Sequence, residues 1–250
     1  MVDQYDVIII GGGAAGENVA GRTQPGGLRT VIIEADLVGG ECSYWACMPS
    51  KALLRPAEVL AQARRVPAAS GAVTGTVDVE KTLRSRDAFA NQYDDYGQAQ
   101  WVESIEADLI RGQARLAGPR RVSVETADGV RELTAAKAVV LATGSRTAVP
   151  PIPGIEDVGA WSSRDIVTAK AVPESIIVLG MGPVGAEMAQ AWRSLGSEVT
   201  VIDQAQADGF PKIEPFAVEA LVQQMEEDGI RVLLGASVEA VSRQGATTTA

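Results

Sequence analysis

The chain has 250 residues, of which 46% are hydrophobic and 4% are aromatic. This length and composition allow one large α/β domain or two ordinary ones, each with its own core, and exclude a disordered protein. The formal net charge of −10 repels phosphate backbones, and no apolar run approaches the roughly 20 residues of a membrane span, so neither nucleic acid nor a membrane is an expected partner.

The N-terminal segment and the missing histidine exclude two further classes. The segment opens with Asp3 and Asp6 and lacks the basic start and long apolar core of a secretory signal, so we expect a cytoplasmic protein. The chain contains no histidine, which removes the usual imidazole base and a His-rich metal site. We therefore expect no metal site, and any base for proton chemistry would come from elsewhere.

The first predicted elements are a strand, a glycine-rich turn and a helix. Asp6–Ile10 is typical of a buried parallel strand, and a helical run continues through Ala20. A second strand, Thr30–Ile33, ends in Glu34. The glycines of the intervening turn that follow a G-x-G-x-x-G spacing are Gly11, Gly13 and Gly16.

The only two cysteines, Cys42 and Cys47, follow this unit. They are close enough for a disulfide where the backbone permits the short Cα separation. A structural staple is unattractive because so small a loop removes little unfolded-state entropy, and zinc normally takes four ligands. A redox pair is therefore favoured, with inert core cysteines and metal binding as alternatives.

A helix is predicted over Ser50–Arg64, with Pro49 near its start. Cys47 would lie close to the positive end of this helix, and Lys51 lies nearby, so Cys47 is the better candidate for a thiolate. Lys51 as a solvated first-turn lysine is the alternative.

The middle of the chain is less informative. Val66–Val77 resembles a surface connection, and Thr82–Ile105 reads as one helix with Tyr93, Tyr96 and Trp101 packed on its apolar side. A small antiparallel addition is predicted before the strand that starts at Ala138. Its segments are Asp108–Ala117, Arg121–Thr126 and Val130–Thr134.

The opening pattern recurs 169 residues later. Ser175–Leu179 is a predicted strand, a helix runs to Leu195, and the strand Glu198–Ile202 ends in Asp203. The glycines of the second motif are Gly180, Gly182 and Gly185. In both copies the acid that ends the second strand lies 23 positions after the first motif glycine. The chain then continues with a predicted helix over Glu214–Asp228, a strand over Ile230–Leu234 and a possible strand at Val238–Val241.

Each copy has the spacing of a dinucleotide-binding turn. The first glycine makes the tight turn, the second lets the backbone approach a pyrophosphate, and the third lets the helix pack on the strand. The helix N-terminus receives the phosphates, and Glu34 or Asp203 would accept hydrogen bonds from an adenosine ribose. Two structural βαβ units are the alternative. A carboxylate at position 203 favours NAD over NADP because it repels a 2′-phosphate.

The segment Gly39–Lys51 resembles the redox-active segment of the FAD-dependent pyridine nucleotide-disulfide oxidoreductases, which include dihydrolipoamide dehydrogenase, glutathione reductase and mercuric reductase. Val139–Ser145 and Val149–Gly154 match the strand and turn with which that family leaves its flavin domain. The order of the motifs is also that of the family, and the resemblance covers essentially the whole chain.

The resemblance implies an α/β fold with two Rossmann-like, doubly wound domains. Residues 1–149 would form the FAD-binding domain with the cysteine pair, and residues 150–250 an NAD(P)-binding domain that is incomplete. The family's C-terminal dimerisation domain is absent from these residues. We therefore expect the N-terminal part of a chain nearly twice as long, which forms a homodimer, with a degenerate fragment as the alternative.

The resemblance also implies site residues. FAD would lie against Gly11, Gly13 and Gly16, with Glu34 on the ribose and further contacts from Gly40, Lys51, Ala114, Thr143 and Gly144. NAD would bind Gly180, Gly182 and Gly185, with Asp203 on the ribose and Val238 on the adenine side. Cys47 would be the charge-transfer thiolate and Cys42 the thiol that meets the substrate. Lys51 would pair with Glu187 near the flavin, and the base would come from a His-Glu pair of the partner subunit.

The redox segment departs from the family pattern. The family commonly has Thr-Cys-x-Asn-x-Gly-Cys, whereas this chain has bulky Tyr44 and Trp45 between the cysteines. We expect these aromatic rings to pack in the core, with an altered redox turn as the alternative. The Pro-Ser-Lys sequence that ends at Lys51 resembles lipoamide dehydrogenases and mercuric reductases more than glutathione reductases.

These observations predict an FAD-dependent, NAD-preferring disulfide oxidoreductase most like dihydrolipoamide dehydrogenase, acting on a small dithiol or disulfide. A mercuric reductase-like enzyme or another low-molecular-weight disulfide reductase shares the same motifs. A non-catalytic dinucleotide-binding module is the alternative from another class.

Overall fold

The computed structural model describes residues 3–210, 213–245 and 247–250. These residues form two compact units. One contains the described residues up to Met48 together with Ala90–Arg146, and the other contains Pro49–Phe89 together with Thr147–Ala250. The predicted division of cofactors between residues 1–149 and 150–250 stays a prediction, because compactness does not assign a cofactor to a unit.

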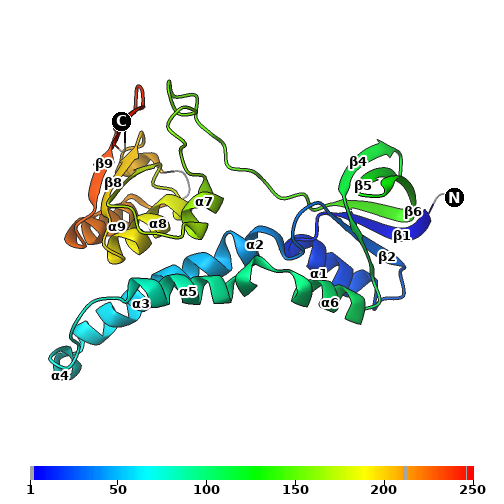
Figure 1. The fold of residues 1–250 in the computed structure, drawn as a ribbon, viewed down its shortest axis with the longest axis horizontal. Helices are drawn as coiled ribbons and strands as arrows, with labels where there is room; N and C mark the ends of the chain where they lie inside the picture. The colour runs from blue at the N-terminus through cyan, green and yellow to red at the C-terminus, as the bar shows by residue number, and fades with distance from the viewer. Residues whose placement is uncertain (1–2, 211–212, 246) are drawn as a thin grey trace. The chain divides into compact units, whose positions relative to one another are not determined.

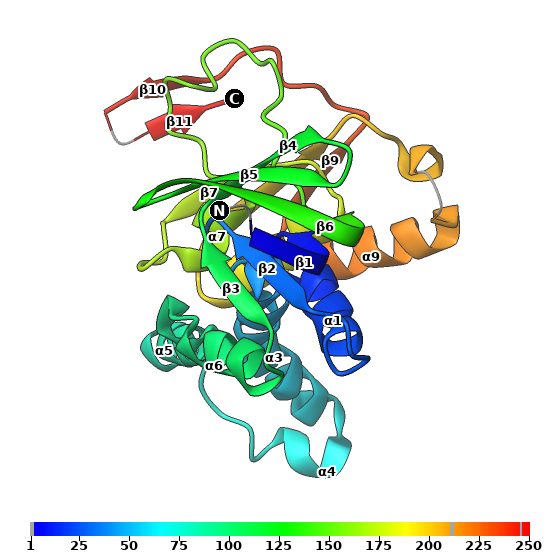
Figure 2. The ribbon, with the colours of Figure 1, turned by 90° about the vertical axis from the view of Figure 1, so that its right-hand side faces the viewer.

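The first unit is built on a six-stranded sheet in the order β3-β2-β1-β6-β5-β4 (Figure 2). Strands β3, β2, β1 and β6 run parallel, and β5 and β4 extend the sheet in antiparallel fashion from β6. The strands are β1 Asp3–Ile10, β2 Thr30–Glu34, β3 Asp108–Arg111, β4 Gln113–Gly118, β5 Arg121–Thr126 and β6 Gly129–Leu141.

The central strand β1 is apolar on both faces. Ile8 and Ile10 pack in one cluster, with side chains of β2, β3, β5 and β6, whereas Val7 and Ile9 pack in the other. The second cluster includes Ala20 from α1 (Ala14–Thr23), so this helix covers that face (Figure 1). Because successive strand side chains point to opposite faces, a continuous run of Val and Ile is what a strand buried on both sides requires.

The other helices of the first unit are α2 Gly40–Tyr44, the 3-10 turn η1 Asn91–Tyr93 and α6 Tyr96–Ser104. The single helix predicted over Thr82–Ile105 is wrong. The chain breaks at η1, where three residues in succession have positive φ, and Asp94 then accepts a hydrogen bond from the backbone N–H of Tyr96 at the start of α6.

The second unit contains a parallel three-stranded sheet in the order β7-β8-β9. Its strands are β7 Ser175–Leu179, β8 Glu198–Asp203 and β9 Arg231–Leu234, and a separate hairpin consists of β10 Ser242–Gln244 and β11 Thr247–Thr249. Its helices are α3 Cys47–Arg65, which starts two residues before this unit, α4 Pro67–Ser70, α5 Val79–Phe89, α7 Ser163–Thr168, α8 Pro183–Ser194, η2 Ala207–Gly209 and α9 Pro215–Glu227. Trp192 of α8 is fully buried and anchors this helix in the core.

The predicted surface connection Val66–Val77 contains the short helix α4, and every residue of this segment is exposed or half-buried. Two other expectations for the connecting segments are corrected. The antiparallel addition does not start at Asp108 as predicted, because β3 pairs parallel with β2. The addition starts with β4, after an interruption of the strand at Gly112. There a methyl group would lie 2.4 Å from the carbonyl oxygen of Glu125. No strand forms at Val238–Val241, where Val241 instead packs with Ile155 and Val158.

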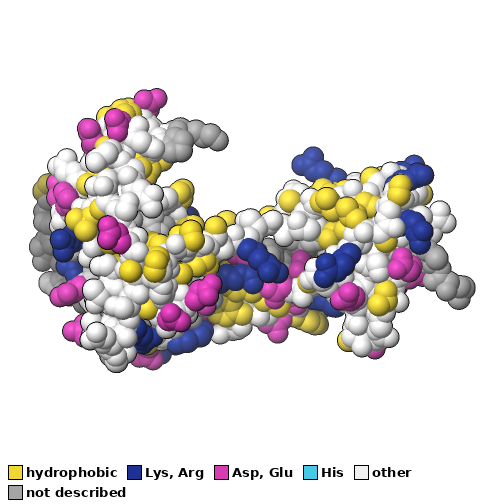
Figure 3. Space-filling model, turned by 90° about the horizontal axis from the view of Figure 1, so that it is seen from above, with side chains coloured by type: hydrophobic (Ala, Val, Ile, Leu, Met, Phe, Trp, Pro, Cys, Tyr) yellow, Lys and Arg dark blue, Asp and Glu magenta, His cyan; other side chains and the backbone are white. Residues whose placement is uncertain are grey.

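Both units contain the strand, glycine turn, helix and strand that the repeat predicts, so the expected α/β fold with two Rossmann-like units is confirmed. None of the helices in the described ranges combines the length and the hydrophobicity needed to cross a membrane. Charged side chains of both signs are scattered over the face shown in Figure 3.

Candidate functional site

The first glycine-rich turn has the close backbone packing that its sequence predicts. Gly11 has a φ of +104°, and its N–H donates to the carbonyl oxygen of Ile33 at 2.8 Å. A methyl group at Gly16 would lie 2.0 Å from the carbonyl oxygen of Gly11, so only glycine lets α1 approach the turn this closely. The end of β6 also lies here, because a methyl group at Gly11 would meet the oxygen of Ala142 at 2.2 Å and the nitrogen of Thr143 at 3.1 Å.

Glu34 ends β2 and faces the same turn. Its carboxylate accepts hydrogen bonds from the N–H groups of Gly12, at 2.6 Å, and Asp36, at 2.8 Å. The carboxylate is therefore fixed at the carboxyl end of the parallel strands, where a Rossmann-like fold binds the ribose of a nucleotide.

The second turn reproduces this arrangement. Gly180 has a φ of +97°, and a methyl group at Gly185 would lie 2.0 Å from the carbonyl oxygen of Gly180. The carboxylate of Asp203 accepts hydrogen bonds from the N–H groups of Met181, at 2.6 Å, and Ala205, at 2.8 Å. The two copies thus agree in their hydrogen bonds as well as in their spacing.

Each turn leads into a helix whose first N–H groups receive no hydrogen bond from a side chain in the part of the chain that the structure describes. Gly13 caps α1 and Gly182 caps α8, and neither helix start receives a side-chain capping bond from the described residues. A methyl group at Gly182 would meet no described atom within 4 Å, and one at Gly13 would meet only Gly40, at 3.7 Å. Free N–H groups beside open space fit the pyrophosphate of a dinucleotide, so the residues present fit both FAD and NAD.

The remaining predicted cofactor residues lie in different surroundings. Gly40 has a φ of +59° and lies against Gly13, whereas Thr143 and Gly144 are exposed just beyond β6. Ala114 pairs with Val124 in the sheet and packs on the core of the first unit. Val238 packs against a small cluster formed by Ile155, Val158 and Val241. It lies two residues after Ala236, and the N–H of Ala236 donates to the carbonyl oxygen of Asp203 at 3.0 Å.

The two cysteines lie at the junction of two helices. Cys42 is in α2 and half-buried, whereas Cys47 is the first residue of α3 and exposed. The two sulfur atoms are not joined by a disulfide. A hydrogen bond with Cys47 and the burial of Cys42, together with the nearby carboxylate of Glu17, raise the pKa of the Cys42 thiol to about 11. Cys42 therefore keeps its proton at neutral pH, whereas the thiolate expected at Cys47 stays a prediction.

The aromatic residues between the cysteines take different positions. Tyr44 is fully buried, as expected for a core side chain, whereas Trp45 is half-buried and meets the ring of Tyr44 edge-on at a centroid distance of 5.6 Å. The hydroxyl of Tyr44 also has a hydrogen-bond partner in the side chain of Gln98, at 2.9 Å. This polar role was not predicted from the sequence.

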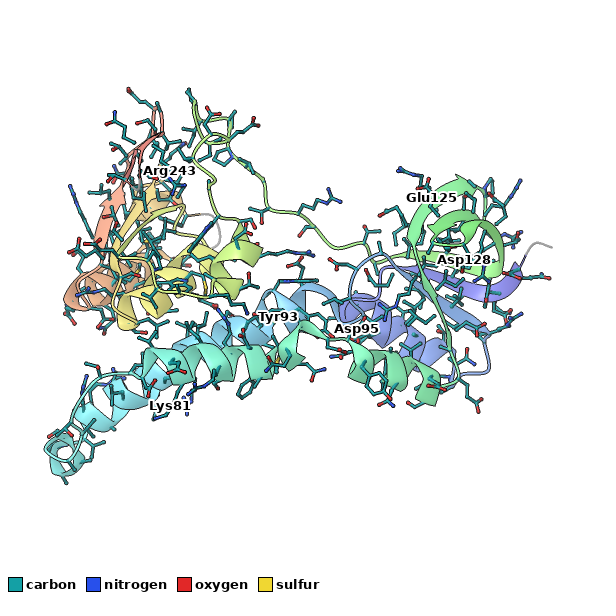
Figure 4. All side chains as sticks on the ribbon, in the orientation of Figure 1. Lys81, Tyr93, Asp95, Glu125, Asp128 and Arg243 are labelled. Atoms are coloured by element: carbon teal, nitrogen blue, oxygen red, sulfur yellow. The ribbon has the colours of Figure 1, made fainter. Side chains whose placement is uncertain are left out.

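Asp95 is a second unpredicted residue of this region (Figure 4). Its carboxylate accepts hydrogen bonds from the N–H of Val38 and pairs with Arg111, both at 2.6 Å. Burial alone would raise the pKa of Asp95, but the bonds from Arg111 and Val38 outweigh it and lower the pKa. The Asp-Asp sequence before α6 is a helix-start signal that identifies this position once the helix break is known.

Lys51 and Glu187 come together within the second unit. The ammonium nitrogen of Lys51, on α3, lies 2.6 Å from both carboxylate oxygens of Glu187, on α8. The side chains are 61% and 34% exposed. The expected contact is therefore present, whereas a catalytic role for the pair stays a prediction.

No cluster of three or more cysteine and carboxylate side chains suited to a metal ion occurs among the described parts of the chain. The absence of a metal site stays a prediction.

Comparisons with known proteins agree with this geometry. A model of the family described as pyridine nucleotide-disulphide oxidoreductase matches residues 5–250. Dihydrolipoyl dehydrogenase of Chlorobaculum tepidum is 36% identical over 98% of this chain and 52% of its own length, and mercuric reductase of Staphylococcus aureus is 30% identical over 98% and 44%. A structure of the HOCl-induced flavoprotein disulfide reductase RclA from Escherichia coli, as a Cu(II) complex, superposes with a TM-score of 0.84 at 25% identity, over 99% of this chain and 53% of RclA. The chain thus spans about half the length of the relatives it matches.

Proposed function

Because this chain belongs to the pyridine nucleotide-disulphide oxidoreductase family, we propose that it is part of a flavoprotein that moves electrons between NAD(H) and a dithiol or disulfide substrate. The observation that carries the proposal is the hydrogen-bonded contact between Cys42 and Cys47 in the same unit as the first dinucleotide-type turn. The family implies FAD and a pyridine nucleotide as cofactors, and the two turns supply matching sites.

The proposed cofactor sites follow the two turns. FAD is held by Gly11, Gly13 and Gly16, with Glu34 on its ribose and Gly40, Lys51, Ala114, Thr143 and Gly144 around it. NAD is held by Gly180, Gly182 and Gly185, with Asp203 on its ribose and Val238 towards the adenine. We propose NAD in preference to NADP because the Asp203 carboxylate would repel a 2′-phosphate. Bound FAD supplies two-electron transfer between the nicotinamide and the cysteine disulfide.

The chemistry of the two cysteines balances as thiol–disulfide exchange. Two electrons from NADH break the Cys42–Cys47 bond and leave a proton on Cys42 and negative charge on Cys47. Cys42 then loses its proton to a base, and its sulfur attacks the substrate disulfide, which releases one substrate thiolate and forms a mixed disulfide. Cys47 attacks the sulfur of Cys42, the second substrate thiolate leaves, and the internal disulfide forms again. The net reaction is NADH, one proton and a disulfide to NAD⁺ and two thiols.

Lys51 and Glu187 have a proposed electrostatic role in this reaction. A lysine held by a carboxylate keeps a fixed positive charge near the place where negative charge develops on reduction. Because the two side chains are exposed, their ion pair contributes little to stability, and the electrostatic role gives the pair another purpose.

For the substrate we propose a small dithiol such as a lipoyl group, because the chain is 36% identical to a dihydrolipoyl dehydrogenase. A mercuric reductase-like activity is the second candidate, supported by the relative of that name at 30% identity. We also propose that the active protein is a homodimer with its acid–base residues in a C-terminal domain. We further propose that it is cytoplasmic, because the cytoplasm keeps dithiols reduced.

Steady-state assays of the purified flavoprotein test the proposal. NADH oxidation is measured with lipoamide, glutathione disulfide and Hg(II) as acceptors, for the parent protein and for Cys42→Ser and Cys47→Ser. We expect turnover with lipoamide and its loss in both variants, with flavin retained. Turnover that survives both substitutions would contradict the redox role of the pair, and turnover with Hg(II) alone would select the second candidate.

A further inference from the structure

Tyr44 has an unusual position, because a fully buried tyrosine lies between the two thiols of an otherwise accessible turn. Its hydroxyl oxygen lies 2.9 Å from Oε1 of Gln98, 3.0 Å from the carbonyl oxygen of Val38 and 3.4 Å from that of Asp94. Gln98 and Asp94 belong to α6 and the residues just before it, whereas Val38 precedes α2. The side chain therefore connects the middle of the cysteine turn to Val38, which precedes the turn, and to α6 with the residue before it.

The phenol is a permanent hydrogen-bond donor. Burial, assisted by the carboxylates of Asp95 and Glu17, raises the pKa of Tyr44 to about 12. Since three acceptor oxygens surround one hydroxyl proton, the group is held whichever of them accepts the bond.

Val38 is fixed from both sides by the same group of residues. Its N–H donates to Asp95 at 2.6 Å, while its carbonyl oxygen faces the hydroxyl of Tyr44. Gly39 provides the space for this arrangement, because a methyl group there would lie 3.0 Å from a ring carbon of Tyr44. Gly39 also has a φ of +111°, which disfavours other residues at this position.

The position of Tyr44 couples its side chain to the sulfur atoms. Cys42 precedes it in α2, which ends at Tyr44. The N–H of the next residue, Trp45, donates to the carbonyl oxygen of Glu41 at 2.8 Å. Cys47 follows as the first residue of α3. A turn whose middle residue is anchored to α6 restricts the separation of its two cysteines, and a restricted separation favours disulfide closure over two independent thiols.

We propose that Tyr44 is a positioning residue of the Cys42–Cys47 pair, which holds the cysteine turn on α6 and so favours closure of the internal disulfide. The proposal rests on the redox role proposed above for the two cysteines. The proposal assigns a function to Tyr44, which occupies the position where the family commonly has asparagine.

Equilibration with dithiothreitol redox buffers tests the proposal without relying on turnover. The holoprotein is incubated in buffers of graded potential, its thiols are trapped by alkylation, and the fraction with the Cys42–Cys47 disulfide is measured by mass spectrometry. In Tyr44→Phe, which removes only the hydroxyl, we expect the equilibrium constant for disulfide formation to fall about threefold to tenfold, a shift of up to ~30 mV toward easier reduction.

Two further variants keep the test decisive. Tyr96→Phe is the matched control, because Tyr96 also lies on α6 and its hydroxyl also meets a glutamine, Gln100, at 2.7 Å, yet its side chain is exposed. We expect its potential to equal that of the parent protein. Gln98→Leu removes an acceptor from the other side, and we expect it to shift the potential in the same direction as Tyr44→Phe.

The outcomes separate this proposal from the proposed function. A parent protein that forms no Cys42–Cys47 disulfide at any potential would overturn both. A normal disulfide in the parent protein, with an unchanged potential in Tyr44→Phe and Gln98→Leu, would overturn the role of Tyr44 alone. If Tyr44→Phe does not fold, Gln98→Leu carries the test by itself.

Discussion

The ammonium nitrogen of Lys51 lies 2.6 Å from each carboxylate oxygen of Glu187, although 136 positions separate the two residues in the chain. Lys51 is in the first turns of the helix that starts at Cys47, and Glu187 lies two residues after the last glycine of the second motif. The pair thus joins α3, the helix that starts at Cys47, to α8, the helix that follows the turn proposed for NAD.

Glu187→Gln separates stability from catalysis. An ion pair this exposed contributes about 0–1 kcal/mol, so we expect the free energy of unfolding to fall by no more than that. If the pair stabilises charge during reduction, the rate of disulfide reduction by NADH falls about tenfold or more. Urea unfolding and stopped-flow reduction measure the two effects.

Glu58→Gln is the control for this comparison. It breaks the exposed pair of Arg55 and Glu58, 3.0 Å apart on α3, so a similar small loss of stability is expected without a change in rate. Equal rates in both variants would remove the catalytic role from Glu187.

The two thiols should react differently with iodoacetamide. At pH 8 we expect Cys47 to be alkylated first, because it is exposed and the pKa of Cys42 is raised to about 11. Since the thiolate is the reactive form, the initial rate of Cys42 alkylation, measured while Cys47 is still unmodified, should rise about tenfold per pH unit until the pH nears 11. Mass spectrometry of the digested protein follows each site.

Cys47→Ser provides the companion measurement. Because the hydrogen bond with Cys47 is the largest cause of the high pKa, we expect the alkylation profile of Cys42 to move to lower pH in this variant. A Cys42 profile that levels off near pH 8.5 in the parent protein would contradict the described geometry.

Asp203 and Glu34 should affect different cofactors. Asp203→Asn removes the charged acceptor proposed for the NAD ribose, so the KM for NADH should rise about tenfold or more and the preference over NADPH should shrink. Glu34→Gln should instead increase flavin loss on dilution, while KM for NADH stays near that of the parent protein. Steady-state kinetics and flavin absorbance after gel filtration distinguish the two, and a rise in KM for NADH from Glu34→Gln alone would reverse the assignment of the turns.

The pH dependence of stability should depend on Asp95. Its pKa in the folded protein is lowered, so the carboxylate stabilises the fold above its ordinary pKa near 3.8, and this contribution disappears as the pH falls through the folded pKa. Asp95→Asn should therefore lower the free energy of unfolding by about 1–3 kcal/mol at pH 7, with a smaller difference from the parent protein below pH 4. Denaturant unfolding at both pH values measures this, and a difference independent of pH would contradict it.

The dinucleotide-type turns could be predicted almost residue by residue. Gly16 and Gly185 each allow a contact that any side chain would block, and the acids at positions 34 and 203 each accept two backbone N–H groups. Such constraints are local, so they leave a regular spacing in the sequence. The strand β7, predicted as Ser175–Leu179, has the same bounds in the structure.

The surroundings of the cysteines could not be predicted in the same way. The break at Asn91–Tyr93 contains no glycine or proline, so the helical sequence pattern continues through it. The chain turns there because three non-glycine residues adopt positive φ. Asp95 and Gln98 reach the cysteine turn only because α6 begins after this break. These contacts join residues more than 50 positions apart, and no local pattern records them.

The measurement that tests the central claim most directly is an anaerobic titration of the purified protein with NADH, followed by absorbance. We predict that one two-electron equivalent produces a long-wavelength band of thiolate-to-flavin charge transfer, and that this band is absent in Cys47→Ser. Bleaching of the flavin without such a band in the parent protein would contradict the account, because Cys42 and Cys47 would then take no part in electron transfer.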